Sequence, residues 1–154
     1  MQKYCLIIFI VIFSSISYGK TFTQAQLTEL AHSFVEAKNA RQQPETNIDD
    51  IEHYLSLLAD DFIDEHIKYN VIINDKNKLR QGMVEKLKDK VISSSIQVEE
   101  MMVGSNVVFV KMIEKGKVQP SHLDKVIEYT ATNIVSLEYN DDGLIKHIRR
   151  HHGF

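Results

Sequence analysis

The stretch that decides the fold is residues 98–110, VEEMMVGSNVVFV. Its centre, Gly104-Ser105-Asn106, is rich in turn-forming residues, and both flanks are rich in valine and methionine. This pattern predicts a β-hairpin, with one strand over residues 96–103 and the next over residues 107–114. We therefore expect this half of the chain to be built from antiparallel strands.

Two more strands are predicted toward the C-terminus. Residues 126–139 carry many β-branched and aromatic side chains, which favour strands. The turn signal Asn140-Asp141-Asp142-Gly143 separates this segment from a last strand over residues 144–152. Residues 116–124, which include Pro120, are expected to form a loop between the strands.

The chain before this sheet has helical periodicity. Thr23 and Gln26 match a capping box, and apolar residues then recur at helical spacing as far as about Arg41. Asn47 is a suitable cap for a second helix, which we expect to end at Asp60-Asp61.

A third helix is predicted after an extended segment over residues 62–73. Its apolar stripe consists of Leu79, Met83, Val84, Leu87 and Val91. Gly82 lowers helix stability, so we expect it near the start of this helix or at a close contact. Helices come first and an antiparallel meander follows, which indicates the α+β class.

Residues 1–19 have the features of a secretory signal peptide. Lys3 precedes an apolar run over residues 4–13, and Ser17 and Gly19 supply small side chains for a cleavage site. The run is about half as long as the ~20 residues that span a bilayer. We therefore expect cleavage before Lys20, a single domain over residues 20–154, and export to the periplasm or the exterior, with no membrane association after cleavage.

Composition excludes several classes of function. The chain has 154 residues, 44% hydrophobic residues and a net charge of −3, which suits one hydrophobic core and gives no strong attraction for nucleic acid. The single cysteine, Cys5, lies in the predicted signal peptide, so the mature chain has no thiol. The sequence has no dinucleotide fingerprint, phosphate-binding loop or H-E-x-x-H motif. We expect neither a cofactor nor a metal.

Five segments, taken in order, resemble a known superfamily. They are residues 51–61 (IEHYLSLLADD), 62–66 (FIDEH), 82–87 (GMVEKL), 98–108 (VEEMMVGSNVV) and 142–145 (DGLI). The chain is similar to the nuclear transport factor 2-like superfamily, in its SnoaL-like (polyketide-cyclase-like) branch. This resemblance implies three N-terminal helices on the concave side of a curved antiparallel sheet, with a cone-shaped pocket between them. The fold hosts enzymes and binding proteins alike.

The first candidate site is Asp64-Glu65-His66. By the resemblance, His66 falls where ketosteroid isomerases of the superfamily carry their catalytic aspartate. A histidine there is suited to proton transfer, because its unperturbed pKa is about 6.5, and Asp64 would assist it. The alternative is a partly exposed histidine with no catalytic role.

Four other residues are candidates for ligand binding. Asn133 interrupts an apolar strand face, where its amide would receive a ligand or bond to neighbouring backbone. Tyr54 and Tyr129 are included with it, and for Tyr129 the alternative is a purely structural role in the core or at its rim. If Arg149 points inward, its guanidinium would pair with Asp64 or with an anionic ligand.

Three functional classes remain open. The leading prediction is an exported domain that binds an apolar or amphipathic small molecule in its pocket. The second is an acid–base enzyme of the isomerase, cyclase or dehydratase type that uses His66. The third is a non-catalytic protein-interaction module whose pocket is filled by side chains.

The strand over residues 107–114 is apolar on both faces. One face carries Val108, Val110 and Met112, and the other carries Val107, Phe109 and Ile113. A strand of this kind is normally covered on both sides, and helices can cover only the concave one. The resemblance implies a homodimer through the sheet, and we expect one here.

Overall fold

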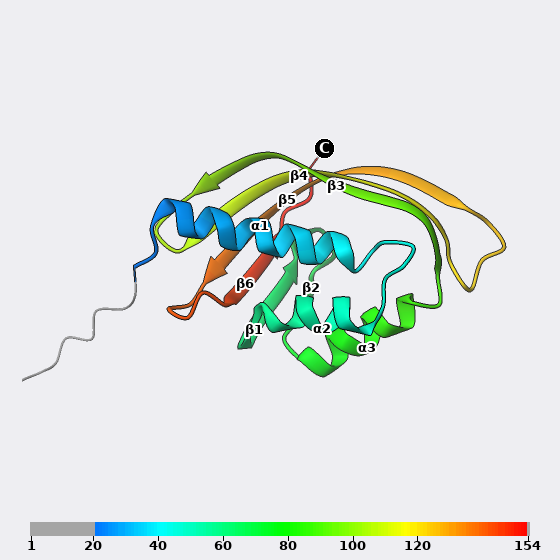
Figure 1. Ribbon diagram of the computed structural model, residues 1–154, viewed down its shortest axis with the longest axis horizontal. Coiled ribbons are helices and arrows are strands. Elements are labelled where there is room, and N and C mark those ends of the chain that lie inside the picture. Colours follow the sequence, from blue (N-terminus) through cyan, green and yellow to red (C-terminus); the bar gives the residue numbers. More distant parts are fainter. Residues whose placement is uncertain (1–20, 154) are drawn as a thin grey trace, which may run out of the picture.

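The computed structural model describes residues 21–153 (Figure 1). The signal peptide predicted for residues 1–19 lies outside this range. In chain order the elements are α1 (Gln24–Ala40), α2 (Ile48–Ser56), β1 (Leu58–His66), the 3-10 helix η1 (Ile67–Tyr69), β2 (Val71–Ile73), α3 (Lys76–Lys86), β3 (Lys90–Val103), β4 (Val107–Gln119), β5 (Ile127–Tyr139) and β6 (Ile145–Arg150).

The strands form one six-stranded sheet in the order β2-β1-β6-β5-β4-β3. All neighbouring strands are antiparallel except β1 and β6, which pair in parallel. Strands β3, β4 and β5 are long and curved, and α1 lies along the inside of their curve (Figure 1). The expected α+β fold, with three helices on a curved sheet, is confirmed.

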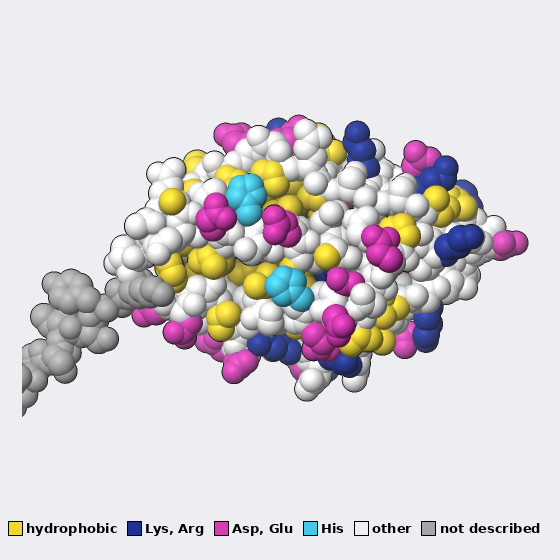
Figure 2. All heavy atoms as spheres, viewed as in Figure 1, with side chains coloured by type: hydrophobic (Ala, Val, Ile, Leu, Met, Phe, Trp, Pro, Cys, Tyr) yellow, Lys and Arg dark blue, Asp and Glu magenta, His cyan; other side chains and the backbone are white. Residues whose placement is uncertain are grey.

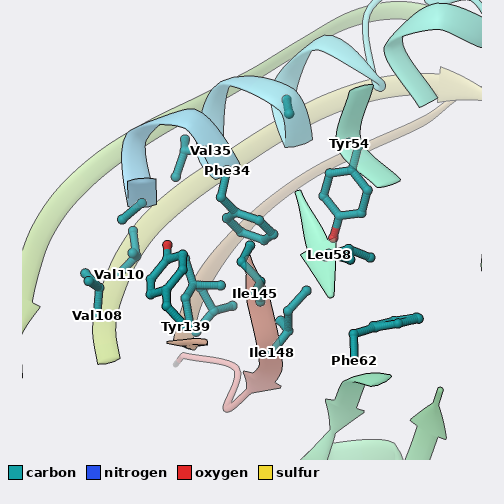
Figure 3. Close-up of a cluster of buried hydrophobic side chains, with 14 of the residues drawn as sticks. Phe34, Val35, Tyr54, Leu58, Phe62, Val108, Val110, Tyr139, Ile145 and Ile148 are labelled. Carbon is teal, nitrogen blue, oxygen red and sulfur yellow. The ribbon is translucent and has the colours of Figure 1, made fainter. Parts of the chain in front are cut away.

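The hydrophobic core fills the space between the helices and the concave face of the sheet. Phe34 of α1 and Tyr54 of α2 contact each other with ring centroids 5.7 Å apart, and both are fully buried. Below them lie side chains of β1 and β6, including Leu58 and Ile148 (Figure 3). Burying an aliphatic or aromatic side chain of this size contributes about 1.5–3 kcal/mol. This core fixes α1 and α2 against the sheet.

The helix starts follow from their capping residues. Thr23 and Gln26 form the expected capping box, and Asn47 forms a second one with Asp50. Asp75 accepts hydrogen bonds from the backbone N–H groups of residues 77 and 78 and so begins α3. Each cap satisfies backbone donors that have no partner within the helix.

The boundary between α2 and β1 differs from the prediction. The helix ends at Ser56 rather than at Asp60-Asp61, because Leu58 already pairs with Ile145 of β6. Leu58 is buried, and strand pairing places it in the core. The register of the pairing between β1 and β6 shifts between Leu58 and Ile63. The exposed Asp60 and Asp61 therefore lie in an irregular part of the strand.

Strands β3 and β4 are longer than predicted. Their pairing continues beyond the predicted ends as far as Lys90 opposite Gln119, and it includes Gly116, which we expected in a loop. At Gly116 the ring of Tyr129 lies so close that a Cβ atom would be 2.5 Å from it. Glycine therefore allows the tyrosine of β5 to lie across β4.

The two faces of β4 have different surroundings. Val108, Val110 and Met112 are all fully buried in the core, so neither Val108 nor Val110 faces outward. Val107, Phe109 and Ile113 occupy the convex face and are half-buried. Within residues 21–153, no helix has the length and apolar character needed to cross a membrane.

Candidate functional site

A cavity of about 440 Å³ lies between α1, α3 and the concave face of the sheet. Its apolar walls come from Ile73, Leu79, Met83 and Val135. Polar and charged side chains line the rest: Lys38, Arg41, Gln42, Asp64, His66, Lys78, Lys86, Glu114, Asn133, Arg150 and His152. This combination of apolar walls and convergent polar groups is typical of small-molecule sites.

Asp64 and Arg150 form a buried ion pair at one side of the cavity. Nε and Nη2 of Arg150 donate to the two carboxylate oxygens of Asp64, each at 2.7 Å, and Asp64 is 1% exposed. Nη2 also lies 3.4 Å from the hydroxyl oxygen of Tyr54. Burial alone would lower the pKa of Arg150, but Tyr54 and Asp64 outweigh it and raise that pKa. The guanidinium of Arg150 is thus paired with a carboxylate inside the protein.

A second buried pair joins Lys38 of α1 to Glu114 of β4. Burial lowers the pKa of Lys38 to about 8. Burial alone would raise the pKa of Glu114, but the charge and hydrogen bond of Lys38 lower it. Asn133 donates to Glu114 at 3.2 Å and the Tyr129 hydroxyl donates at 3.4 Å. Glu114 is therefore the centre of a polar network on the cavity wall.

Arg41, the C-terminal cap of α1, has a different position from the other buried cations. Its guanidinium carbon lies 4.5 Å from the centroid of the Tyr54 ring, within range of a cation–π interaction. Its Nε is buried and has no hydrogen-bond partner among residues 21–153. Burial is also the main reason why the pKa of Arg41 is lowered.

His66 lies at the end of β1, where its half-buried ring lines the cavity. Burial lowers its pKa, and the positive charge of Arg150 lowers it further, although Asp64 acts in the opposite direction. The lowered pKa favours the neutral imidazole, which is the form that accepts a proton. Its Nε2 lies 3.7 Å from Oδ1 of Asp64, too far for a good hydrogen bond.

The structure brings together four of the six predicted site residues. His66, Asp64 and Asn133 line the cavity, and Tyr129 contacts its wall through Glu114. Asn133 and Tyr129 both donate to the carboxylate of Glu114, so Asn133 binds a side chain rather than the neighbouring backbone that was its expected alternative. Tyr129 also lines an adjoining hollow of about 270 Å³ that shares Arg41 with the cavity.

Two of the predicted site residues lie elsewhere. Tyr54 is fully buried in the core and holds Arg41 and Arg150 instead of lining the cavity. Arg149 is exposed on the convex face, where its Nε donates to Glu65 at 2.7 Å. Strand alternation explains the difference: Arg150 lies on the same face as buried Ile148, so Arg150 is the inward arginine.

Other hollows and clusters are weaker candidates. A hollow of about 390 Å³ around residues 119–124 is lined mainly by exposed residues at the far end of β3 and β4. None of the charged side chains that line it is buried. Among residues 21–153, no group of three or more His, Cys, Asp or Glu side chains is arranged to hold a metal ion.

Comparison with known proteins identifies the fold. No protein-family model matches the sequence, and no curated protein sequence is similar to it. A provisionally assigned SnoaL-like polyketide cyclase from Shewanella denitrificans OS-217 superimposes with a TM-score of 0.69 at 10% identity, over 85% of this chain and 92% of that one.

Two further solved structures show the range of this fold. An epoxide hydrolase of the LEH-like type from M. tuberculosis gives a TM-score of 0.60 at 12% identity, over 84% of each chain. A computationally designed 17-OHP binder gives 0.62 at 16% identity, over 84% of this chain and 92% of that one. The chain therefore has the nuclear transport factor 2-like fold that its sequence resembles.

Proposed function

We propose that this protein binds a small molecule with an apolar part in the cavity between α1, α3 and the concave face of the sheet. The observation that carries the proposal is the cavity itself, which lies open beside a core of buried apolar side chains. A pocket filled by side chains, as an interaction module would have, does not fit this arrangement. Proteins of the same fold named as enzymes and as a designed binder support the proposal.

Gly82 offers a direct test, because it lies in the middle of α3 and lines the cavity. The prediction that Gly82 lies near the helix start or at a close contact is wrong. A Cβ atom at this position would meet nothing within 4 Å. Leucine at this position would project into the cavity. It would also favour the helix by about 0.5–1 kcal/mol relative to glycine.

We therefore predict that Gly82→Leu stabilises the protein and weakens ligand binding about tenfold or more. NMR titration with 1-octanol and octanoate measures binding through the shifts of cavity residues, and urea unfolding measures stability. Gln81→Leu is the matched control, because Gln81 is an exposed neighbour on α3 outside the cavity. Binding that is equal in Gly82→Leu and in the unaltered protein would contradict the proposal.

A second candidate function is acid–base catalysis, and His66 is the observation that favours it. The side chain lines the cavity, and burial and Arg150 lower its pKa and so favour the neutral form, which suits a general base. Asp64 is bound to Arg150, so its role toward His66 is electrostatic rather than a direct hydrogen bond.

If His66 is the base, His66→Ala should abolish turnover of a substrate while the melting temperature stays nearly unchanged. A screen of ester, epoxide and ketosteroid substrates supplies the assay. Turnover that survives the substitution would remove His66 from the mechanism. A large loss of melting temperature would show that the ring has a structural role.

A further inference from the structure

The cavity carries an excess of positive charge. Five cations and two carboxylates line it, so it holds three uncompensated positive charges when its histidines are neutral. The whole chain, by contrast, has a net charge of −3. On the face shown in Figure 2, acidic and basic side chains are interspersed. The positive excess is therefore a local property of the cavity.

The two carboxylates of the cavity are already occupied. Asp64 accepts hydrogen bonds from Nε and Nη2 of Arg150, and Glu114 forms an ion pair with Lys38. Three cations remain: Arg41 inside, and Lys78 and Lys86 at the exposed rim formed by α3. Among residues 21–153, none of the three forms an ion pair with a carboxylate.

Arg41 is the group whose position most requires an explanation. A guanidinium carries five N–H donors, and leaving a buried donor unsatisfied costs about 1–3 kcal/mol. The ring of Tyr54 stabilises the face of the guanidinium, but it accepts none of these hydrogen bonds in the plane. A bound anion would satisfy both the charge and the donors of Arg41.

The apolar wall restricts what that anion is. Ile73, Leu79, Met83 and Val135 offer no hydrogen bonds, so they favour a hydrocarbon or ring portion over water. A purely inorganic anion would leave this wall in contact with water. A cationic ligand would meet the uncompensated charges of Arg41, Lys78 and Lys86.

We propose that the ligand of this cavity is an amphipathic organic anion, whose carboxylate or similar acidic group pairs with Arg41 while its apolar part lies against Met83 and Val135. Lys78 and Lys86 attract the anion at the rim. This inference rests on the proposed function and narrows it to one class of ligand.

The test is an NMR titration of the purified protein with octanoate, 1-octanol and octylamine, which share a hydrocarbon chain and differ in head-group charge. Octanoate is expected to bind about tenfold or more tightly than 1-octanol, because a hydrogen bond to a charged group is worth that much. Octylamine should bind more weakly than either.

Substitutions locate the effect. Arg41→Gln should weaken octanoate binding about tenfold to a hundredfold and leave 1-octanol binding unchanged. Lys86→Gln should weaken octanoate binding about two- to fivefold, as expected for an exposed charge. The matched control is Lys125→Gln, an exposed lysine outside the cavity, for which no change is expected. If Arg41→Gln does not fold, Lys86→Gln and the comparison of head groups decide.

The outcomes separate the two proposals. Equal binding of octanoate and 1-octanol in the cavity, unaffected by Arg41→Gln and Lys86→Gln, would overturn the anion and leave the binding function standing. If none of the three ligands shifts the signals of cavity residues, both the anion and the binding function are overturned.

Discussion

At the scale of single residues, the molecule is distinguished by charged side chains placed inside its curved sheet. Lys38, Asp64 and Glu114 are each at least nine-tenths buried. Buried ion pairs rarely stabilise a fold more than apolar residues of the same size would, because desolvation of the charges is costly. Their presence on a cavity wall is more consistent with a site that must recognise a polar group.

The pair of Lys38 and Glu114 gives a stability prediction. Lys38→Met leaves the buried carboxylate of Glu114 without its cation and should lower the free energy of unfolding by about 3–5 kcal/mol. Adding Glu114→Leu removes the unpaired charge and should restore at least half of that loss, although Asn133 then loses its acceptor. Urea denaturation of both variants measures this. An unchanged stability of Lys38→Met would show that the pair is not buried as described.

Part of the site was predictable from residue periodicity, and part was not. Lys38 and Arg41 continue the stripe of Leu27, Ala31 and Phe34 on α1, so their inward position could have been recognised. Likewise, Glu114 continues the inward row of Val108, Val110 and Met112. These residues were not among the predicted site residues, because Arg41 and Glu114 were interpreted as the ends of a helix and a strand. Which charges pair with which depends on tertiary contacts that no local pattern contains.

At the scale of elements, local signals located the three α-helices and most strands. The caps Thr23 and Asn47 and the hairpin turn at residues 104–106 are where the sequence indicated them. Errors occurred where strand pairing overrode local preference. Strand β1 begins at Leu58 because Leu58 pairs with β6, and β3 begins as early as Lys90 because Lys90 pairs with β4. The parallel pairing of β1 with β6 joins segments far apart in the chain, so no local motif could indicate it.

At the scale of the whole molecule, the convex face of the sheet remains a candidate interface. We propose a homodimer through this face, since Val107, Phe109 and Ile113 are outward-facing apolar residues on β4. Phe109 also stacks on His151, with ring centroids 6.2 Å apart.

Export after cleavage before Lys20 also stays a prediction, which intact mass of the mature protein would test.

Phe109→Glu is expected to dissociate the homodimer, because the interface would bury an unpaired carboxylate. The monomer should stay folded, because water reaches the carboxylate on its free convex face. Val108→Glu, one residue away but in the core, should instead prevent folding. Sedimentation equilibrium at micromolar concentration reports the mass of each form. A monomer for the unaltered chain would refute the dimer.

We propose that the cavity between α1, α3 and the sheet is a ligand site. A crystal structure of the complex with 8-bromooctanoate tests it most directly, because the anomalous signal of bromine locates the ligand. We expect one bromine peak beside Met83 and Val135, with the carboxylate directed toward Arg41. A cavity that holds only water, with bromine on the convex face or near residues 119–124, would contradict the claim.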